Sequence, residues 1–199
     1  MFDYYFFYKP FQVLSQFSEA ADKKTLKDFF SNIKKEVYPV GRLDYDSEGL
    51  LLLTNDKKLN HLLLHPTFSH EREYWVQVEG IPDNAALHQL QNHIVIHVNG
   101  QDYTTKKAYA SIMNPPPEIP ERNPPIRFRK NIPTSWLSLT LSEGKNRQVR
   151  KMTAAAGYPT LRLIRHRIGN FTTTGMQPGD IVHIRREIKQ DLFRKKFLL

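Results

Sequence analysis

Hydrophobic residues along this chain recur mostly at the spacing of strands, with a few segments at helical spacing. The clearest signal is an uninterrupted run of four leucines at residues 50–53, which follows a polar turn and ends at Thr54-Asn55-Asp56. A short apolar run bounded by polar residues is typical of a strand buried on both faces. We therefore expect this strand to lie at the centre of the fold.

Alternation of apolar and polar positions predicts further strands. Between residues 72 and 78, the side chains of Tyr74, Val76 and Val78 share one face, as in a half-buried strand. The other strands predicted in this way cover residues 4–8, 11–15, 136–141, 160–168 and 181–185.

One hairpin is predicted from its turn. Asn-Gly is the strongest short-range signal for a two-residue hairpin turn, and Asn99-Gly100 is such a pair. We expect residues 94–98 and 106–113 to be the two strands that this turn joins.

Helices are predicted where apolar residues recur at helical spacing beside capping residues. Thr25 is a suitable N-cap for a helix over residues 25–33, and Asn55 or Asp56 for a helix that Pro66 ends. Two more predicted helices cover residues 82–91 and 146–157, and residues 187–196 are expected to form a polar terminal helix or tail.

These elements predict an α+β fold with a large mixed, mainly antiparallel sheet, flanking helices and a central cleft. The length of 199 residues, with 40% hydrophobic residues, suits a single domain. We expect one catalytic domain over residues 1–199, with room for two lobes, the N-terminal lobe covering about residues 1–65. No cysteine is present, which fits a reducing cytoplasm, and no apolar run is long enough to span a bilayer.

The charge of the chain indicates a polyanionic partner. Lysine and arginine outnumber aspartate and glutamate by 29 to 20, which gives a net charge of +9. Nucleic acid is the first candidate, and a solvated basic surface without a partner is the alternative. The densest basic segment carries seven cations and no acid between Lys145 and Arg167.

A proline-rich segment at residues 115–125 holds six of the thirteen prolines, so we expect a stiff exposed loop rather than a helix or central strand. Four cations interrupt or follow it: Arg122, Arg127, Arg129 and Lys130. Such a loop could clamp RNA or simply be a solvated linker.

Asp44 is the candidate catalytic residue, because it lies on the shoulder of the buried leucine strand, where a carboxylate is held rigidly. Asp44 and Asp46 could instead only satisfy the turn backbone. The spacing of Asp44, Asp46 and Glu48 also resembles the start of a calcium loop, but Asn55 stands where that loop needs a bidentate glutamate. We predict no metal site here.

The stretch GRLDYDSEGLLLLTND resembles the catalytic motif of the A-type pseudouridine synthases of small-subunit ribosomal RNA and their relatives. These enzymes convert a uridine in structured RNA into pseudouridine. Two more segments, REYWVQVEG and SEGKNRQVRKM, extend the resemblance over most of the chain. Within the family, the chain is most similar to the E-type group, which acts on large-subunit ribosomal RNA.

The resemblance implies a role for each matching residue. Asp44 would be the nucleophile, Arg150 its basic partner and Tyr74 the aromatic residue against the target base, although Tyr74 also suits a plain core position. Arg42 would take the space of the flipped nucleotide, and Leu163 would line the pocket. The expected RNA contacts are Arg42, Lys145, Arg147, Lys151, Arg162 and Arg165.

The chemistry of the reaction agrees with these residue types. A base cannot rotate inside a stack, so it must be flipped into a pocket. A carboxylate nucleophile can hold the fragment while it is free, and a fixed guanidinium offsets the desolvation that would oppose ionisation of that carboxylate. An isomerisation needs no metal or redox cofactor.

The resemblance also implies how the protein docks on RNA. Many relatives carry a small RNA-binding domain ahead of the catalytic domain, and this sequence leaves no room for one. We therefore expect a cytoplasmic monomer whose catalytic domain binds ribosomal RNA by itself.

Two other functions fit parts of the pattern. A non-catalytic RNA-binding or ribosome-assembly protein on the same scaffold would explain the charge, although not the Asp44 motif. A calcium-dependent nuclease could use Asp44, Asp46 and Glu48.

Overall fold

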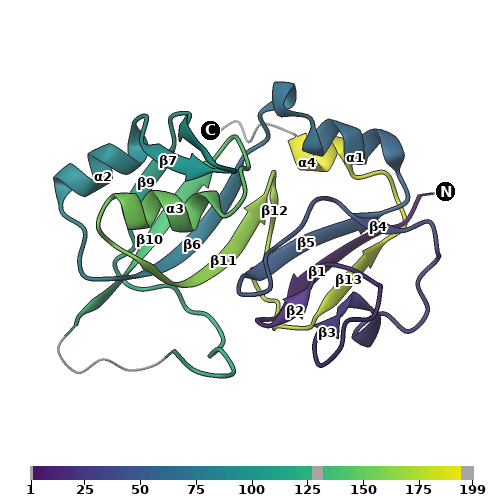
Figure 1. Ribbon diagram of the computed structural model, residues 1–199. Helices are drawn as coiled ribbons and strands as arrows, with labels where there is room; N and C mark the ends of the chain where they lie inside the picture. Colours follow the sequence, from purple (N-terminus) through teal and green to yellow (C-terminus); the bar gives the residue numbers. More distant parts are fainter. Residues whose placement is uncertain (1, 127–131, 194–199) are drawn as a thin grey trace. The chain divides into compact units, whose positions relative to one another are not determined.

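The computed structural model describes residues 2–126 and 132–193 (Figure 1). The chain forms two compact units: the first contains the residues up to 69 and those from 166 onward, and the second contains residues 70–165. The predicted lobe boundary near residue 65 lies close to the first break. The residues from 166 onward, however, return to the first unit, which the sequence pattern did not indicate.

Three antiparallel neighbours build the sheet of the first unit, in the order β13 (Ile181–Ile184), β1 (Tyr4–Lys9) and β5 (Glu48–Thr54). The short strand β4 (Tyr38–Pro39) also pairs with β5. Every residue of β5 is buried, which confirms the prediction from the leucine run.

The leucines of β5 alternate between two cores, because successive side chains in a strand point to opposite faces. Leu50 and Leu52 pack with residues of β1, of α1 (Lys57–Leu64) and of α4 (Lys189–Phe193). Leu51 and Leu53 pack on the other face in a cluster that contains Phe7.

The cap of α1 is Asp56, one of the two predicted residues. Its Oδ1 accepts hydrogen bonds from the backbone N–H groups of Lys58 and Leu59, both at 3.0 Å. Its Oδ2 accepts a third hydrogen bond from the Tyr4 hydroxyl, also at 3.0 Å. This single carboxylate therefore ties α1 to β1.

Thr25 is an N-cap as predicted, but its helix is only the 3-10 turn η1 (Leu26–Asp28). The predicted helix over residues 25–33 is wrong in length. Phe29 and Phe30, which come next, pack their rings against Phe7 at centroid distances of 5.1 and 5.3 Å. Core packing here outweighs the local helical pattern.

The second unit contains the antiparallel neighbours β6 (Arg72–Glu79), β10 (Thr134–Leu141) and β9 (Tyr109–Ile112). On the other side of β6 lies β11 (Thr160–Ile168), of which residues 160–165 belong to this unit. Two helices, α2 (Asn84–Gln91) and α3 (Gln148–Ala155), contribute to the core on one face of these strands, and Figure 1 shows α3 lying across that face.

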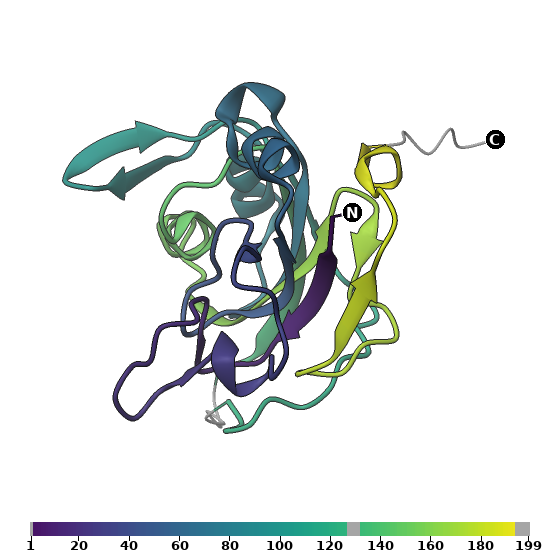
Figure 2. The same cartoon turned by 90° about the vertical axis from the view of Figure 1, so that its right-hand side faces the viewer.

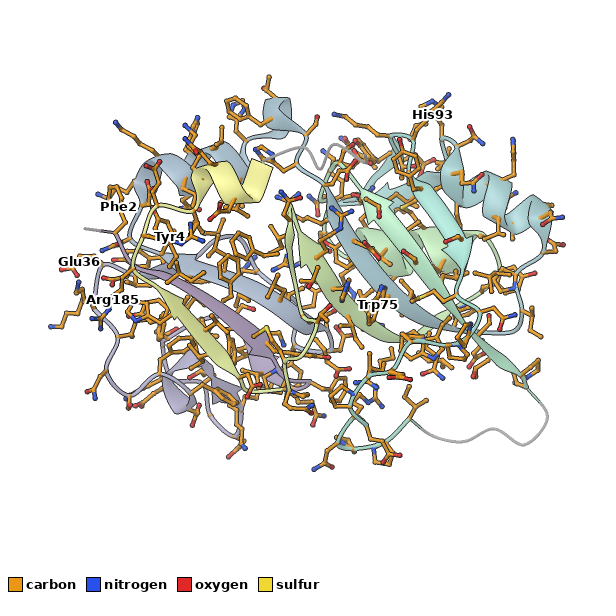
Figure 3. The ribbon with its side chains drawn as sticks, turned by 180° about the vertical axis from the view of Figure 1, so that it is seen from behind. Phe2, Tyr4, Glu36, Trp75, His93 and Arg185 are labelled. Carbon is orange, nitrogen blue, oxygen red and sulfur yellow. The ribbon has the colours of Figure 1, made fainter. Side chains whose placement is uncertain are left out.

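Alternation along β6 decides which side chains enter this core. Val76 and Val78 are fully buried in it, and Tyr74 packs against it as the shared face predicted. Trp75 is on the opposite face (Figure 3), where its indole Nε1 donates to the Glu73 carboxylate at 3.1 Å.

The hairpin forms at the predicted turn, but its second strand differs from the predicted one. β7 (Val95–Val98) pairs with β8 (Gln101–Thr104), and the Asn99-Gly100 turn joins them with positive φ at both residues. β9 instead pairs with β10, so the predicted pairing with residues 106–113 is wrong. A two-residue turn pairs the residues directly beside it, and these end at Thr104. Figure 2 shows the hairpin extending from its unit.

The remaining short elements are β2 (Val13–Leu14), β3 (Lys24–Thr25), η2 (Pro66–Phe68) and β12 (Phe171–Thr172). Because β2 is only two residues long, the predicted strand over residues 11–15 was too long. The fold is α+β, as predicted. The central cleft stays a prediction.

None of the helices in the described part of the chain could span a bilayer. The proline-rich segment contains no helix or strand over residues 115–125, in agreement with the predicted loop. Arg127, Arg129 and Lys130, predicted to lie beside it, fall outside the described residues.

Candidate active site

Asp44 lies in the loop between β4 and β5, and both of its neighbours in the chain are fixed by hydrogen bonds. The Ser15 hydroxyl donates to the carbonyl of Leu43 at 2.8 Å and accepts from the Leu43 N–H at 3.1 Å. On the other side, the carbonyl of Tyr45 accepts from the Gln12 N–H at 2.8 Å. The backbone on each side of the Asp44 carboxylate is therefore held in place.

A buried lysine organises the segment that supplies these contacts. Lys9 is fully buried, and its Nζ donates to the carbonyls of Pro10 and Val13 at 2.9 and 2.8 Å. An ammonium group inside the protein requires such acceptors, since burying it without them is costly. The turn around Gln12, where φ is +58°, is thus fixed from inside.

Sequence analysis missed Ser15, Lys9 and Gln12 as parts of the site. Lys9 and Pro10 lie between the strands predicted over residues 4–8 and 11–15. The contact from Ser15 to Leu43, however, spans 28 positions along the chain, and no periodic pattern records it.

The carboxylates of the loop differ in exposure. Asp44 and Asp46 are half-buried, whereas Glu48 is 2% exposed because it is the first residue of β5. A strand therefore follows this loop, whereas an EF-hand calcium loop is followed by a helix. Among the described residues, no three acidic, histidine or cysteine side chains gather as a metal site.

Tyr74 is half-buried on β6 and receives a hydrogen bond from the side chain of Arg165. Arg165 is only 4% exposed, and burial lowers the pKa of its guanidinium. Tyr74 and the buried Arg165 are therefore neighbours within the second unit.

Helix α3 carries the predicted arginine. Val149 and Met152 are buried in the core of the second unit, which fixes the helix. Arg150, which follows Val149 in the chain, is half-buried. Arg147 is exposed at the N-cap position with a left-handed backbone, φ +53°, and makes no side-chain cap. Lys151 is half-buried on the same helix.

Three other predicted residues are buried. Leu163 is 5% exposed and belongs to the core of the second unit. Arg162 is 5% exposed and donates to the carbonyl of Pro120 at 2.9 Å, so it anchors the proline-rich loop. The burial of Arg162 and Arg165 argues against the predicted role of either as a surface contact for phosphate.

The structure brings Tyr74, Leu163 and the core side of α3 together in the second unit. Arg42, which is exposed, and Asp44 belong to the first unit. Arg150 and Tyr74 belong to the second unit. That Asp44 approaches these two residues stays a prediction.

Comparison with known proteins identifies the family. Residues 3–155 match the model of the RNA pseudouridylate synthase family, a range that contains Asp44, Tyr74 and Arg150. The chain belongs to this family. The resemblance drawn from the three sequence motifs is thereby confirmed.

Two curated members of the RNA pseudouridylate synthase family illustrate the similarity. The chain is 48% identical over 174 residues to the ribosomal large subunit pseudouridine synthase E of Vibrio vulnificus (strain CMCP6), covering 87% of this chain and 71% of that protein. It is 45% identical over 172 residues to the protein of the same name in Xanthomonas axonopodis pv. citri (strain 306), covering 85% and 87%.

A solved pseudouridylate synthase has the same fold. Its crystal structure superposes with a TM-score of 0.72 over 92% of this chain and 70% of that one, at 24% sequence identity. The predicted pseudouridine synthase fold is therefore confirmed.

Proposed function

We propose that this protein isomerises a specific uridine in large-subunit ribosomal RNA to pseudouridine. The observation that carries the proposal is the 45–48% identity, over most of both chains, to proteins named ribosomal large subunit pseudouridine synthase E. The fixed backbone around Asp44 supports it, since a nucleophile must be held in a productive geometry.

The reaction exchanges one bond of the uracil ring for another. The glycosidic bond between the sugar C1′ and N1 breaks, the base rotates, and a bond from C1′ to C5 forms. The proton on C5 leaves and N1 gains one, so no atom is lost and no oxidant or reductant is needed. The protein must therefore hold a detached base and move one proton.

Asp44 is the proposed nucleophile, which attacks either the sugar or the ring carbon and holds the fragment covalently. Arg150 is proposed as the guanidinium that keeps this carboxylate ionised once the site closes over the base. Tyr74 is proposed to lie against the base and to remove the C5 proton, with Arg165 orienting its oxygen. Leu163 is proposed to line the pocket.

We propose that the accessible cations among the RNA contacts expected from the sequence bind the RNA. Arg42 and Arg147 are exposed, as is Lys145, and Lys151 is half-buried. Arg42 would occupy the space that the flipped nucleotide leaves. Phosphate contacts of this kind position the RNA without reading its sequence. We also propose that the protein acts as a monomer in the cytoplasm.

The test is pseudouridine formation on large-subunit ribosomal RNA by the wild type and by Asp44→Asn. We expect Asp44→Asn to lose at least about 10³-fold in kcat, because the amide cannot act as the nucleophile. The matched control is Asp46→Asn in the same loop, which should retain turnover. Undiminished turnover by Asp44→Asn would refute the assignment.

The net charge of +9 supports one alternative, a non-catalytic RNA-binding protein on the same scaffold. It predicts that the wild type binds ribosomal RNA without forming pseudouridine and that Asp44→Asn binds equally well. A calcium-dependent nuclease would instead lose its activity in chelator and would need Asp46 as much as Asp44.

A further inference from the structure

The carboxylate of Glu143 joins two segments of the second unit that are 37 positions apart in sequence. Its Oε2 accepts from the Tyr103 hydroxyl at 2.5 Å. Its Oε1 accepts from the backbone N–H of Lys106 at 2.9 Å and from the Gln148 side-chain amide at 2.6 Å. One side chain thus connects β8, the segment after β8, and the start of α3.

Gln148 extends this network into the basic loop before α3. It is 3% exposed, and its Oε1 accepts from the backbone N–H of Lys145 at 2.8 Å. The Lys145 ammonium lies 4.5 Å from the centroid of the Tyr103 ring, which is a cation–π contact. The loop that carries Lys145 and Arg147 is therefore fastened to the β7–β8 hairpin at two points.

The segment after β8 is fastened as well. The N–H of Thr105 donates to the carbonyl of Ile94 at 3.0 Å, and its hydroxyl accepts from the Ile94 N–H at 3.1 Å. The N–H of Ala108 donates to the carbonyl of Gln91 at 3.1 Å. Lys106 and Lys107, both exposed, are presented between these two anchors on a fixed backbone.

These bonds fix the backbone of two segments, one carrying Lys106 and Lys107 and the other carrying Lys145 and Arg147, through a carboxylate whose two oxygens accept three hydrogen bonds. All four cationic side chains are exposed. Like charges held on a fixed framework repel one another unless an anion lies between them, and a row of phosphates provides such anions. The fixed framework also lowers the entropy cost of binding.

We propose that Lys106 and Lys107 bind RNA phosphates together with Lys145 and Arg147, as one surface that Glu143 positions. We call these four residues the 106–147 surface. The inference rests on the proposed function, because it extends the RNA contacts of that same reaction. It adds Lys106 and Lys107, which lie outside the sequence motifs. It also gives Tyr103 of the β7–β8 hairpin a role in positioning this surface.

The first experiment measures the affinity for transcribed large-subunit ribosomal RNA at several salt concentrations. The double variant Lys106→Ala/Lys107→Ala should bind more weakly, and the slope of log affinity against log salt should become shallower by about 1.4 to 1.8, the value for two phosphate contacts.

The matched control is Lys57→Ala/Lys58→Ala, an adjacent exposed pair on α1 with the same change in charge. Its salt slope should stay within about 0.5 of the wild-type slope. Equal losses in the two pairs, or an unchanged slope in Lys106→Ala/Lys107→Ala, would overturn the proposal.

The second experiment measures the RNA affinity of Glu143→Gln, for which electrostatics and loss of positioning predict changes in opposite directions. Glu143→Gln removes a negative charge from the network that joins the two cationic segments, so electrostatics alone predicts tighter RNA binding. The amide Nε2 cannot accept a hydrogen bond, so this variant loses part of the network that positions the surface. We expect affinity to fall about three- to tenfold because positioning dominates.

Tyr103→Phe tests the same point without changing charge, since it removes only the hydroxyl donor. It should also weaken RNA binding, and it keeps the test open if Glu143→Gln does not fold. Unchanged or tighter binding in a folded variant would refute the positioning role. Binding is measured without turnover, so a wild type that forms no pseudouridine would refute the proposed function and leave this result intact.

Discussion

At the scale of single residues, Ser15 shows how the loop of the proposed nucleophile is held. Ser15 is 7% exposed, and its hydroxyl donates to the Leu43 carbonyl and accepts from the Leu43 N–H, directly before Asp44. A buried hydroxyl with two partners restricts the loop to one position. The side chain does no chemistry itself, so we regard it as a positioning residue.

Ser15→Ala should lower kcat by about 10- to 100-fold with little change in KM, because a small displacement of a reacting group is costly. The expected loss in stability is about 1–2 kcal/mol. Ser15→Thr, which retains the hydroxyl, should recover part of kcat. The exposed Ser18→Ala is the control and should behave as wild type. A Ser15→Ala enzyme with normal kcat would show that the loop needs no such contact.

Asp3 illustrates a charge whose effect on stability depends on pH. The hydrogen bond from Lys34 lowers the pKa of the Asp3 carboxyl, burial opposes the shift, and a hydrogen bond from His183 adds to it. The Nζ of Lys34 is 2.6 Å and the Nε2 of His183 3.0 Å from the carboxylate oxygens.

A carboxyl whose folded pKa is depressed stabilises the protein above its unfolded pKa, and this contribution is lost as pH falls through the folded pKa. Asp3→Asn should therefore be less stable than wild type in urea unfolding at pH 7. The difference should shrink below about pH 3.8, where Asp3 of the unfolded chain becomes protonated. A difference that is constant across this range would contradict the assignment.

At the scale of elements, β5 is the part of the fold on which both cores of the first unit depend. Its leucines alternate between them, so neither face of the strand meets solvent. The strand also carries the loop of Asp44 at its start. Loss of packing around β5 would affect the proposed active site as well as stability.

Leu52→Ala should destabilise the protein by about 2–5 kcal/mol, because the fully buried side chain leaves a cavity. Ile81→Ala is the matched control, since Ile81 is 62% exposed, and it should cost less than about 0.5 kcal/mol. Chemical denaturation measures both. Similar losses for the two variants would mean that β5 is not a rigid core strand.

At the scale of the whole molecule, the two compact units divide the proposed catalytic residues between them. Asp44 comes from the first unit, and Tyr74 and Arg150 come from the second. The family match over residues 3–155 crosses both units. The proposed mechanism therefore draws on residues of both units.

Much of this could be read from the sequence because it is encoded locally. The leucine run, the alternation at Tyr74, Val76 and Val78, and the cap at Asp56 each depend on neighbours within a few positions. Local patterns therefore predicted the main strands and helices, and motif similarity predicted the family.

The tertiary structure alone decided which distant groups meet. The contact of Ser15 with Leu43, the bond from Lys106 to Glu143 and the pairing of β9 with β10 join residues far apart along the chain. The sequence did not indicate that Arg162 and Arg165 are buried, because a cation in a basic segment has the same sequence pattern whether or not it faces solvent. Periodicity records which face of an element is apolar, but the partner of that face is set only when the chain packs.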